Sequence, residues 1–164
     1  MLRSLGLAIG LVVLAGSIQA QEALFATKSL TPETALTAAL AALESCRKQG
    51  FQVAVAVTDR SGLTQVLLRD RFAGAHTTDM ASNKAWTAAS FRMSTTTLAI
   101  ETQAGRAQSG LRNQPRFVGA AGGLPIEGAG SILGAIGVSG APGGDADEAC
   151  AKAGIQAIAD SLEF

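Results

Sequence analysis

The sequence has no tyrosine, one histidine and two cysteines among its 164 residues. A single imidazole excludes a zinc site built from several histidines, and the absence of a Gly-x-Ser-x-Gly motif argues against a serine hydrolase. No Cys-x-x-Cys-His motif is present, which excludes a covalently attached c-type haem. The two cysteines do not form a Cys-x-x-Cys pair, which argues against a thioredoxin-like redox role.

An excess of charge of either sign is also missing. The chain has 13 basic and 13 acidic residues, a formal net charge of zero, so there is no electrostatic case for DNA, RNA or anionic lipid as a partner. An apolar fraction of 48% with only 16% charged residues is not that of a disordered chain. The 19 glycines follow no Gly-X-Y period, which excludes collagen. We expect one globular domain with a mainly aliphatic core.

The first 20 residues have the pattern of a secretory signal peptide. Arg3 precedes an apolar run over residues 5–15, and Ser17-Ile18-Gln19-Ala20 offers small residues for cleavage after Ala20. We therefore expect a periplasmic or secreted protein, with residues 21–164 forming one domain and no membrane span after signal removal. In an oxidising compartment Cys46 and Cys150 are predicted to form a disulfide. The alternative is two buried free thiols.

Hydrophobic periodicity predicts the first half of the domain clearly. Thr31-Pro32-Glu33 is typical of a helix start, and Gly50 ends a helix on which Leu36, Leu40 and Leu43 recur at helical spacing. Residues 52–58 and 63–69 are predicted strands of a hairpin. Two helices then follow, over residues 79–91 and from 95 or 96 to about 104.

The second half is predicted to contain three short strands and a closing helix. The strands are Phe117-Val118, residues 124–127 and residues 132–138, with Pro125 expected at an edge or a strand start because it cannot donate to a ladder. The closing helix begins near Asp145 and places Ala151, Ile155, Ile158 and Leu162 on one face. This order favours an α+β fold with one five-stranded antiparallel sheet and packed helices.

A glycine cluster over residues 134–144 is the most conspicuous motif. A dinucleotide-binding fingerprint places its glycines in a turn between a strand and a helix, whereas Gly134 and Gly137 fall inside the predicted strand. We interpret them as residues that let a helix pack closely on a central strand. Backbone N–H groups of residues 143–147, at the start of the closing helix, remain a second candidate as an anion site.

The only histidine, His76, lies in a glycine-containing loop just before a predicted helix. Met80 and Lys84 follow at intervals of four, so they share one helical face beneath that loop. This is a candidate ligand site, with a solvated loop histidine as the alternative. Cations and aromatic residues near this segment are further candidates for ligand contacts: Arg69, Arg71, Arg92, Phe72, Trp86 and Phe91. The alternative is that they are ordinary surface charges and core aromatics.

Four sequence blocks together resemble the GlcG/HbpS family of haem-binding proteins. They are residues 53–62, 84–91, 122–126 and 134–140, within a similarity running from about Thr31 to Leu162. The resemblance implies a compact profilin-like α/β sandwich, assembly into homo-oligomers and, in exported members, haem binding. It also implies kinship with a domain attached to some corrinoid adenosyltransferases. Lys84, Thr87, Gly123, Pro125 and Ile126 match the family's blocks.

We therefore expect a haem-binding protein that buffers, senses or transfers haem. His76 is the expected axial ligand because it is the only imidazole and tyrosine is absent. One alternative is a binding protein for another small molecule, or an accessory of a periplasmic oxidoreductase. Another is an enzyme on a small acid substrate with Lys84 and His76 as acid–base partners. The expected ligand-binding residues are Arg71, Phe72, His76, Met80, Lys84, Thr87 and Pro125.

Overall fold

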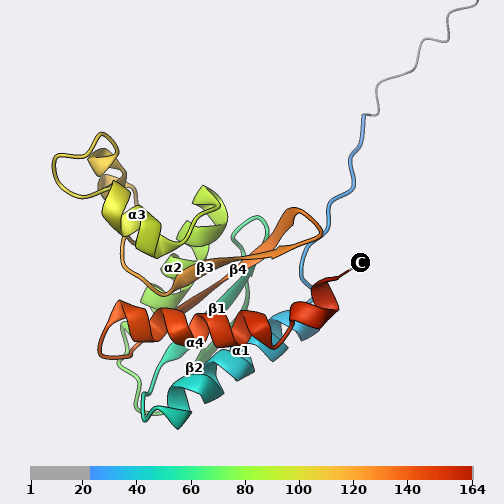
Figure 1. Cartoon of the computed structure of the whole chain (residues 1–164), viewed down its shortest axis with the longest axis horizontal. Helices are drawn as coiled ribbons and strands as arrows, with labels where there is room; N and C mark the ends of the chain where they lie inside the picture. Colours follow the sequence, from blue (N-terminus) through green and yellow to red (C-terminus); the bar gives the residue numbers. More distant parts are fainter. Residues whose placement is uncertain (1–22, 164) are drawn as a thin grey trace, which may run out of the picture.

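The computed structural model of the chain describes residues 23–163, and the predicted signal peptide with its cleavage site after Ala20 lies outside them. Within the described residues, four α-helices and four strands follow one another (Figure 1). Two 3-10 helices cover Ser109–Asn113 and Ala159–Leu162. The α-helices and strands are α1 (Pro32–Lys48), β1 (Ala54–Asp59), β2 (Thr64–Arg69), α2 (Thr77–Phe91), α3 (Thr95–Glu101), β3 (Gly123–Gly128), β4 (Ser131–Ser139) and α4 (Gly144–Gln156).

Local sequence signals explain where the helices begin and end. The Thr31 hydroxyl accepts a hydrogen bond from the backbone N–H of Thr34 at 3.3 Å, and Pro32 occupies the first turn of α1. Beyond the end of α1, Gly50 has a φ of +80°, a conformation that glycine adopts without strain. Ser94 caps α3 in the same way as Thr31 caps α1, through the N–H of Thr97 at 3.1 Å. The predicted start of the first helix is confirmed.

The sheet is antiparallel, in the order β2-β1-β4-β3. The predicted hairpin of β1 and β2 is present. β3 and β4 form a second hairpin, joined by Ala129 and Gly130, both with positive φ, as a type I′ turn requires. Pro125 lies on β3 opposite Ala135, and β3 is an edge strand, as predicted.

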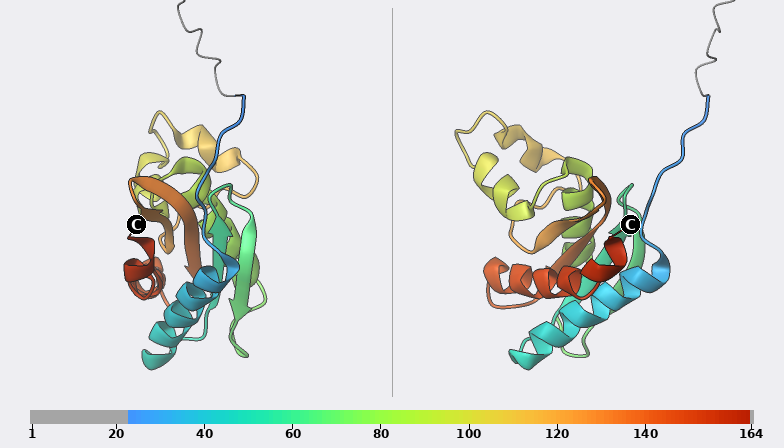
Figure 2. Two further views of the ribbon diagram at one scale, coloured as in Figure 1. Left: turned by 90° about the vertical axis from the view of Figure 1, so that its right-hand side faces the viewer. Right: turned by 45° about the vertical axis from the view of Figure 1, so that its right-hand side comes forward.

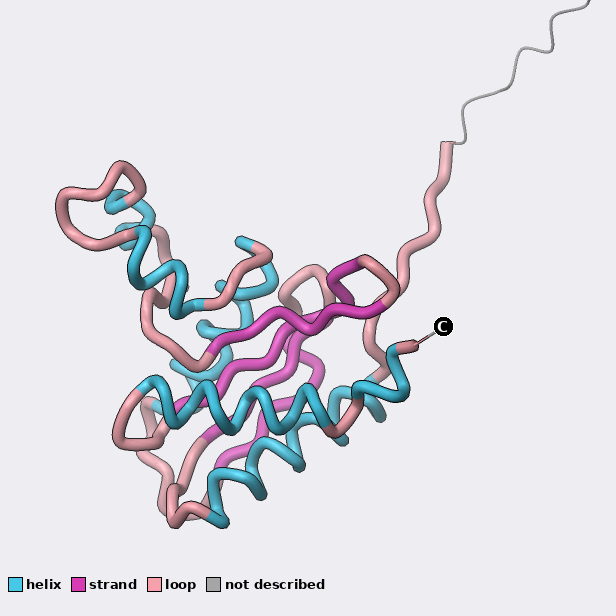
Figure 3. The backbone as a smooth tube through the Cα atoms, viewed as in Figure 1, coloured by secondary structure: helices cyan, strands magenta, loops and turns pink. Residues whose placement is uncertain are grey.

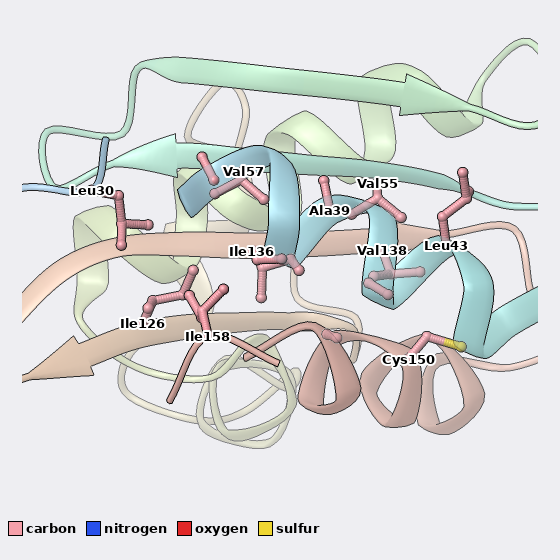
Figure 4. Close-up of a cluster of buried hydrophobic side chains, with 14 of the residues drawn as sticks. Leu30, Ala39, Leu43, Val55, Val57, Ile126, Ile136, Val138, Cys150 and Ile158 are labelled. Carbon is pink, nitrogen blue, oxygen red and sulfur yellow. The ribbon is translucent and has the colours of Figure 1, made fainter. Parts of the chain in front are cut away.

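Helices cover both faces of the sheet (Figures 2 and 3). α1 and α4 pack together on one face, where branched side chains of β1 and β4 form the main core (Figure 4). α2 packs on the other face, where Ala54 and Ala56 of β1 contact Ala81 and Ala85 of α2. A Cβ at Gly137 of β4 would lie 2.2 Å from the carbonyl oxygen of Ala81 on α2, so this helix rests almost directly on the sheet backbone. The interpretation of Gly137 as a packing glycine is confirmed.

The predicted fifth strand, Phe117-Val118, is wrong, and the sheet has four strands. The backbone N–H of Val118 donates to the Thr87 hydroxyl of α2 at 3.1 Å, so it is bound to a side chain and not to a neighbouring strand. Arg116, directly before Phe117, has a φ of +73°, which interrupts an extended conformation. An apolar pair with β propensity is therefore held in a loop by a contact to α2.

The predicted apolar face of α1 is confirmed at Leu43, which is buried, but not at the other two leucines. Leu36 and Leu40 are 42% and 50% exposed, whereas four alanines of α1 are fully buried. The reason is the close approach of α4, because a Cβ at Gly154 would lie 2.6 Å from the carbonyl oxygen of Ala38. Larger side chains would not fit between the two helices.

The predicted disulfide between Cys46 and Cys150 is confirmed. It joins α1 to α4, with a Cα–Cα distance of 5.5 Å, and both residues are fully buried. Within residues 23–163, none of the helices has the length and hydropathy needed to cross a membrane.

Glu148 of α4 connects the body of the fold to α3. Its carboxylate accepts a hydrogen bond from the Thr96 hydroxyl and pairs with Lys152 Nζ at 2.7 Å. Partial burial raises the pKa of Glu148, but the hydrogen bonds from Lys152 and Thr96 and the charge of Lys152 outweigh this and leave the pKa below its ordinary value of 4.5.

Candidate functional site

A pocket of about 480 Å³ opens at the end of the sheet where β1 begins and β4 ends. Four parts of the chain that lie far apart in the sequence line it: residues 50–52 between α1 and β1, the stretch from Phe72 into α2, Ala120 in the loop before β3, and the stretch from Ser139 into α4. Its volume is in the range of small-molecule sites. Four of the residues predicted from the sequence line it together: Phe72, His76, Met80 and Lys84.

His76 stands at the rim of this pocket, immediately before α2. Its backbone carbonyl accepts the N–H of Met80 at 3.1 Å, which fixes the residue to the first turn. The imidazole is exposed and does not cap the helix, and within residues 23–163 it has no hydrogen-bond partner. A Cβ at Gly74 would lie 2.7 Å from His76 Cε1, so the glycine leaves room for the ring. The imidazole nitrogens are therefore available to a ligand.

Apolar groups flank the imidazole. Met80 lies one helical turn further on and is half-buried, and the ring of Phe72 is 80% exposed. Exposure of a large aromatic ring to water is unfavourable in free energy, and burial against a ligand removes that penalty. This side of the pocket therefore suits a ligand with an apolar surface and a group that binds nitrogen or sulfur.

The floor of the pocket contains a buried ion pair. Lys84 Nζ lies 2.8 Å from Asp147 Oδ2 and donates to the carbonyl oxygen of Val138 at 2.9 Å. The two charged side chains are 4% and 5% exposed. Asp147 Oδ1 in turn accepts the backbone N–H of Ala141 at 3.0 Å. The pair thus joins α2, β4 and α4 beneath the pocket, and its charges neutralise each other.

The prediction from sequence did not identify Asp147 as part of the site. Asp147 lies near the start of the closing helix, where an acid is common, and it is 63 residues from Lys84. The glycine-rich stretch from Gly140 to Gly144 was noticed, and it does line the pocket.

Three predicted ligand-binding residues do not line the pocket. Arg71 is exposed beside Phe72 but is not among the lining residues. Thr87 is fully buried, and its hydroxyl donates to the carbonyl oxygen of Arg116 at 3.3 Å besides holding Val118. Pro125 lies on the edge strand β3. A ligand-binding role for these three stays a prediction.

The other candidate cations and aromatics do not converge on the pocket either. Arg69 donates to the carbonyl oxygen of Ala73, and Arg92 follows the last residue of α2, at the opposite end from His76. The Trp86 ring lies under the guanidinium of Arg116 at 4.9 Å. Phe91 packs edge-on against Phe117, with ring centroids 5.4 Å apart.

Comparisons of the sequence and of the fold with known proteins lead to the same family. The family model described as "Haem degrading protein HbpS-like" matches residues 30–156. A crystal structure of a double mutant of Streptomyces reticuli HbpS is 41% identical, covering 87% of this chain and 96% of the other, with a TM-score of 0.77. The Klebsiella pneumoniae protein ORFY is 26% identical over 85% and 97% of the two chains, with a TM-score of 0.81.

Two further matches bear on ligand and length. A crystal structure of a PduOC:haem complex is 29% identical, covering 79% of this chain and 95% of the other, with a TM-score of 0.75. A curated Citrobacter freundii protein, described as an uncharacterised 15.0 kDa protein in the dhaT-dhaS intergenic region, is 38% identical over 90 residues. That match spans 54% of this chain and 63% of the relative, which is less than two thirds of the relative's length.

Proposed function

The chain belongs to the HbpS-like family, and from this premise we propose that it binds haem in the pocket between α2 and the start of α4. The family's description names haem, and one similar structure is a haem complex. The single observation that carries the proposal is the free imidazole of His76 at the rim of a pocket whose neighbouring surface includes Met80 and Phe72.

The residues present fit the chemistry of a haem. Haem iron accepts an axial imidazole or thioether, and its macrocycle is a flat apolar surface. His76 supplies the only imidazole in the sequence, and no tyrosine is available as a substitute. Both cysteines are in the disulfide. We propose His76 as the axial ligand, Met80 as the second candidate and the exposed Phe72 ring as a contact for the macrocycle.

Charge balance in the pocket favours a ligand whose carboxylates stay near solvent. Lys84 is already paired with Asp147 on the floor, so no free cation of the described residues lines the pocket. Arg71, exposed next to Phe72, is the proposed partner for a propionate. We further propose that the protein acts after export, in haem buffering, sensing or transfer, as the sequence of its first 20 residues suggests.

The alternative of a non-haem ligand uses the same pocket and remains the second candidate. The geometry disfavours the enzymatic alternative, in which Lys84 exchanges protons with His76. Lys84 Nζ is buried and bonded to both Asp147 and Val138. It would have to break both contacts to reach a substrate.

The test is a hemin titration of a protein beginning at residue 21, followed by visible absorption. We expect a saturable one-to-one shift of the Soret band, lost or displaced in His76→Ala and altered in Met80→Leu. Met93→Leu is the matched control, because Met93 is also partly exposed but lies beyond the far end of α2. If the shift is the same in all variants, the protein binds haem but not at this site. If no saturable shift is observed, the proposal of haem binding is rejected.

A further inference from the structure

A second site lies at the other end of the sheet and is unrelated to the haem proposal. There the β1–β2 turn, the β3–β4 turn and the end of α2 come together (Figure 1). Asp59, the last residue of β1, pairs with Gly134 near the start of β4, which places the two turns side by side. Since α2 has 15 residues and rises 1.5 Å per residue, this end lies about 20 Å from His76.

Two arginines line the hollows at this end. Arg60 from the β1–β2 turn and Arg92 from the end of α2 share two adjoining hollows of about 320 and 220 Å³. The hydroxyl residues Ser61 and Ser131 line them as well. Within residues 23–163, no carboxylate lines either hollow, and neither arginine has an ion-pair partner.

The acid nearest in sequence is already engaged. Asp59 Oδ1 accepts the backbone N–H groups of Ser61 and Leu63 at 2.8 and 2.9 Å, so it holds the turn together. Arg60 is steadied by a hydrogen bond to the Thr27 hydroxyl, which is neutral. Within residues 23–163, neither guanidinium group therefore has a carboxylate as a direct ion-pair partner.

The backbone at Arg92 gives a second, independent indication. Arg92 ends α2 with φ 53° and ψ 40°, the left-handed conformation for which glycine is strongly preferred. A positive charge is favoured near the C-terminal, negative end of a helix. That effect does not require the left-handed backbone, and a lysine would satisfy it as well as an arginine. A residue other than glycine thus occupies this position at a backbone cost, and it lines the same two hollows as Arg60.

We propose that Arg60 and Arg92 form a binding site for a small oxyanion, a phosphate or a carboxylate group. Two guanidinium groups offer paired N–H donors to such an anion, and hydroxyls of Ser61 and Ser131 complete the set of donors. Ile132 and Ala89 provide an apolar wall next to the cations, so the oxyanion is expected to carry a small organic part.

The experiment is a titration without haem, followed by ¹H–¹⁵N NMR of the backbone amides of Gly130 and Ser131. Inorganic phosphate and succinate are the two probes, each at constant ionic strength adjusted with sodium chloride, because screening alone weakens exposed charges. If only phosphate gives saturable shifts, the ligand group is a phosphate. If only succinate does, the ligand group is a carboxylate. Saturable shifts with both assign a general oxyanion site.

Three variants separate this site from general charge effects. Arg92→Gly removes the guanidinium and fits the left-handed backbone, so it is expected to fold at least as well as the parent protein while its Kd rises about ten-fold or more. Arg60→Gln is expected to weaken binding similarly. Arg106→Gln removes one exposed positive charge elsewhere and is expected to leave the Kd unchanged. An absence of saturable shifts, or equal shifts in all variants, overturns the proposal.

Discussion

Replacing Lys84 by methionine removes one partner of the buried ion pair beneath the pocket. Methionine keeps the length of the side chain and fills most of its volume, so the change is mainly one of charge. Asp147 is then left 5% exposed with the single backbone N–H of Ala141 as its donor. The carbonyl oxygen of Val138 also loses the donor that reaches it from Lys84.

The expected loss is large because the remaining charge cannot reach water. Breaking a buried pair by removing one partner costs about 3–5 kcal/mol. The whole free energy of unfolding of a domain is about 5–15 kcal/mol. At about 2–4 °C per kcal/mol for a chain of this size, the melting temperature is expected to fall by roughly 6–20 °C.

Urea unfolding of three variants measures this effect. Lys84→Met is compared with Lys152→Met, which breaks the pair with Glu148 at a similar distance of 2.7 Å but from a side chain that is 67% exposed. The surface change is expected to cost less than about 1 kcal/mol. The double variant Lys84→Met with Asp147→Leu removes both charges and is expected to recover much of the loss. A cost of Lys84→Met no greater than that of Lys152→Met, or a double variant no more stable than Lys84→Met alone, would refute a large penalty for the unpaired buried charge.

Three further changes test the packing and the electrostatics. Gly137→Ala places a Cβ 2.2 Å from the Ala81 carbonyl oxygen and is expected to cost about 2 kcal/mol or more in urea unfolding, whereas Gly110→Ala, with open space around it, is expected to be nearly neutral. Cys46→Ala with Cys150→Ala removes a link across 104 residues, worth about 4–5 kcal/mol on the loop-entropy model; an unchanged urea midpoint would contradict this. Because the folded pKa of Glu148 lies below 4.5, its stabilisation is complete above that pH and lost as the pH falls through the folded pKa. The deficit of Glu148→Gln is therefore expected to be constant near pH 7 and to shrink below about pH 4.5, and a deficit that grows on acidification would show that the sign is wrong.

Local signals were enough to predict most of the elements. Thr31 and Pro32 predict the start of α1, and the small and branched residues of 52–58 predict β1. Helix capping and residue periodicity depend only on neighbours in the sequence. The grouping of His76, Met80 and Lys84 followed from helical spacing alone, since residues four apart share a face.

Features that depend on long-range contacts could not be predicted in the same way. Val118 has the residue type of a strand, but its N–H is taken by Thr87, 31 residues away. Leu36 and Leu40 have the spacing of a buried face, but the close approach of α4 at Gly154 favours alanines there. Asp147 reaches Lys84 only because β4 packs on α2 and leads into α4 at the end of the sheet, and no local sequence pattern predicts that contact.

The most direct test of the proposed haem site is ¹H–¹⁵N NMR of the protein in the presence of one equivalent of ferric haem. The paramagnetic iron broadens nearby amide signals, so the affected residues locate it. We expect broadening centred on residues 50–52, 72–80 and 139–144, the segments that contribute to the pocket lining, and sharp signals for residues 129–132 at the far end of the sheet. Broadening centred on any other surface, or spread evenly over the chain, would contradict it.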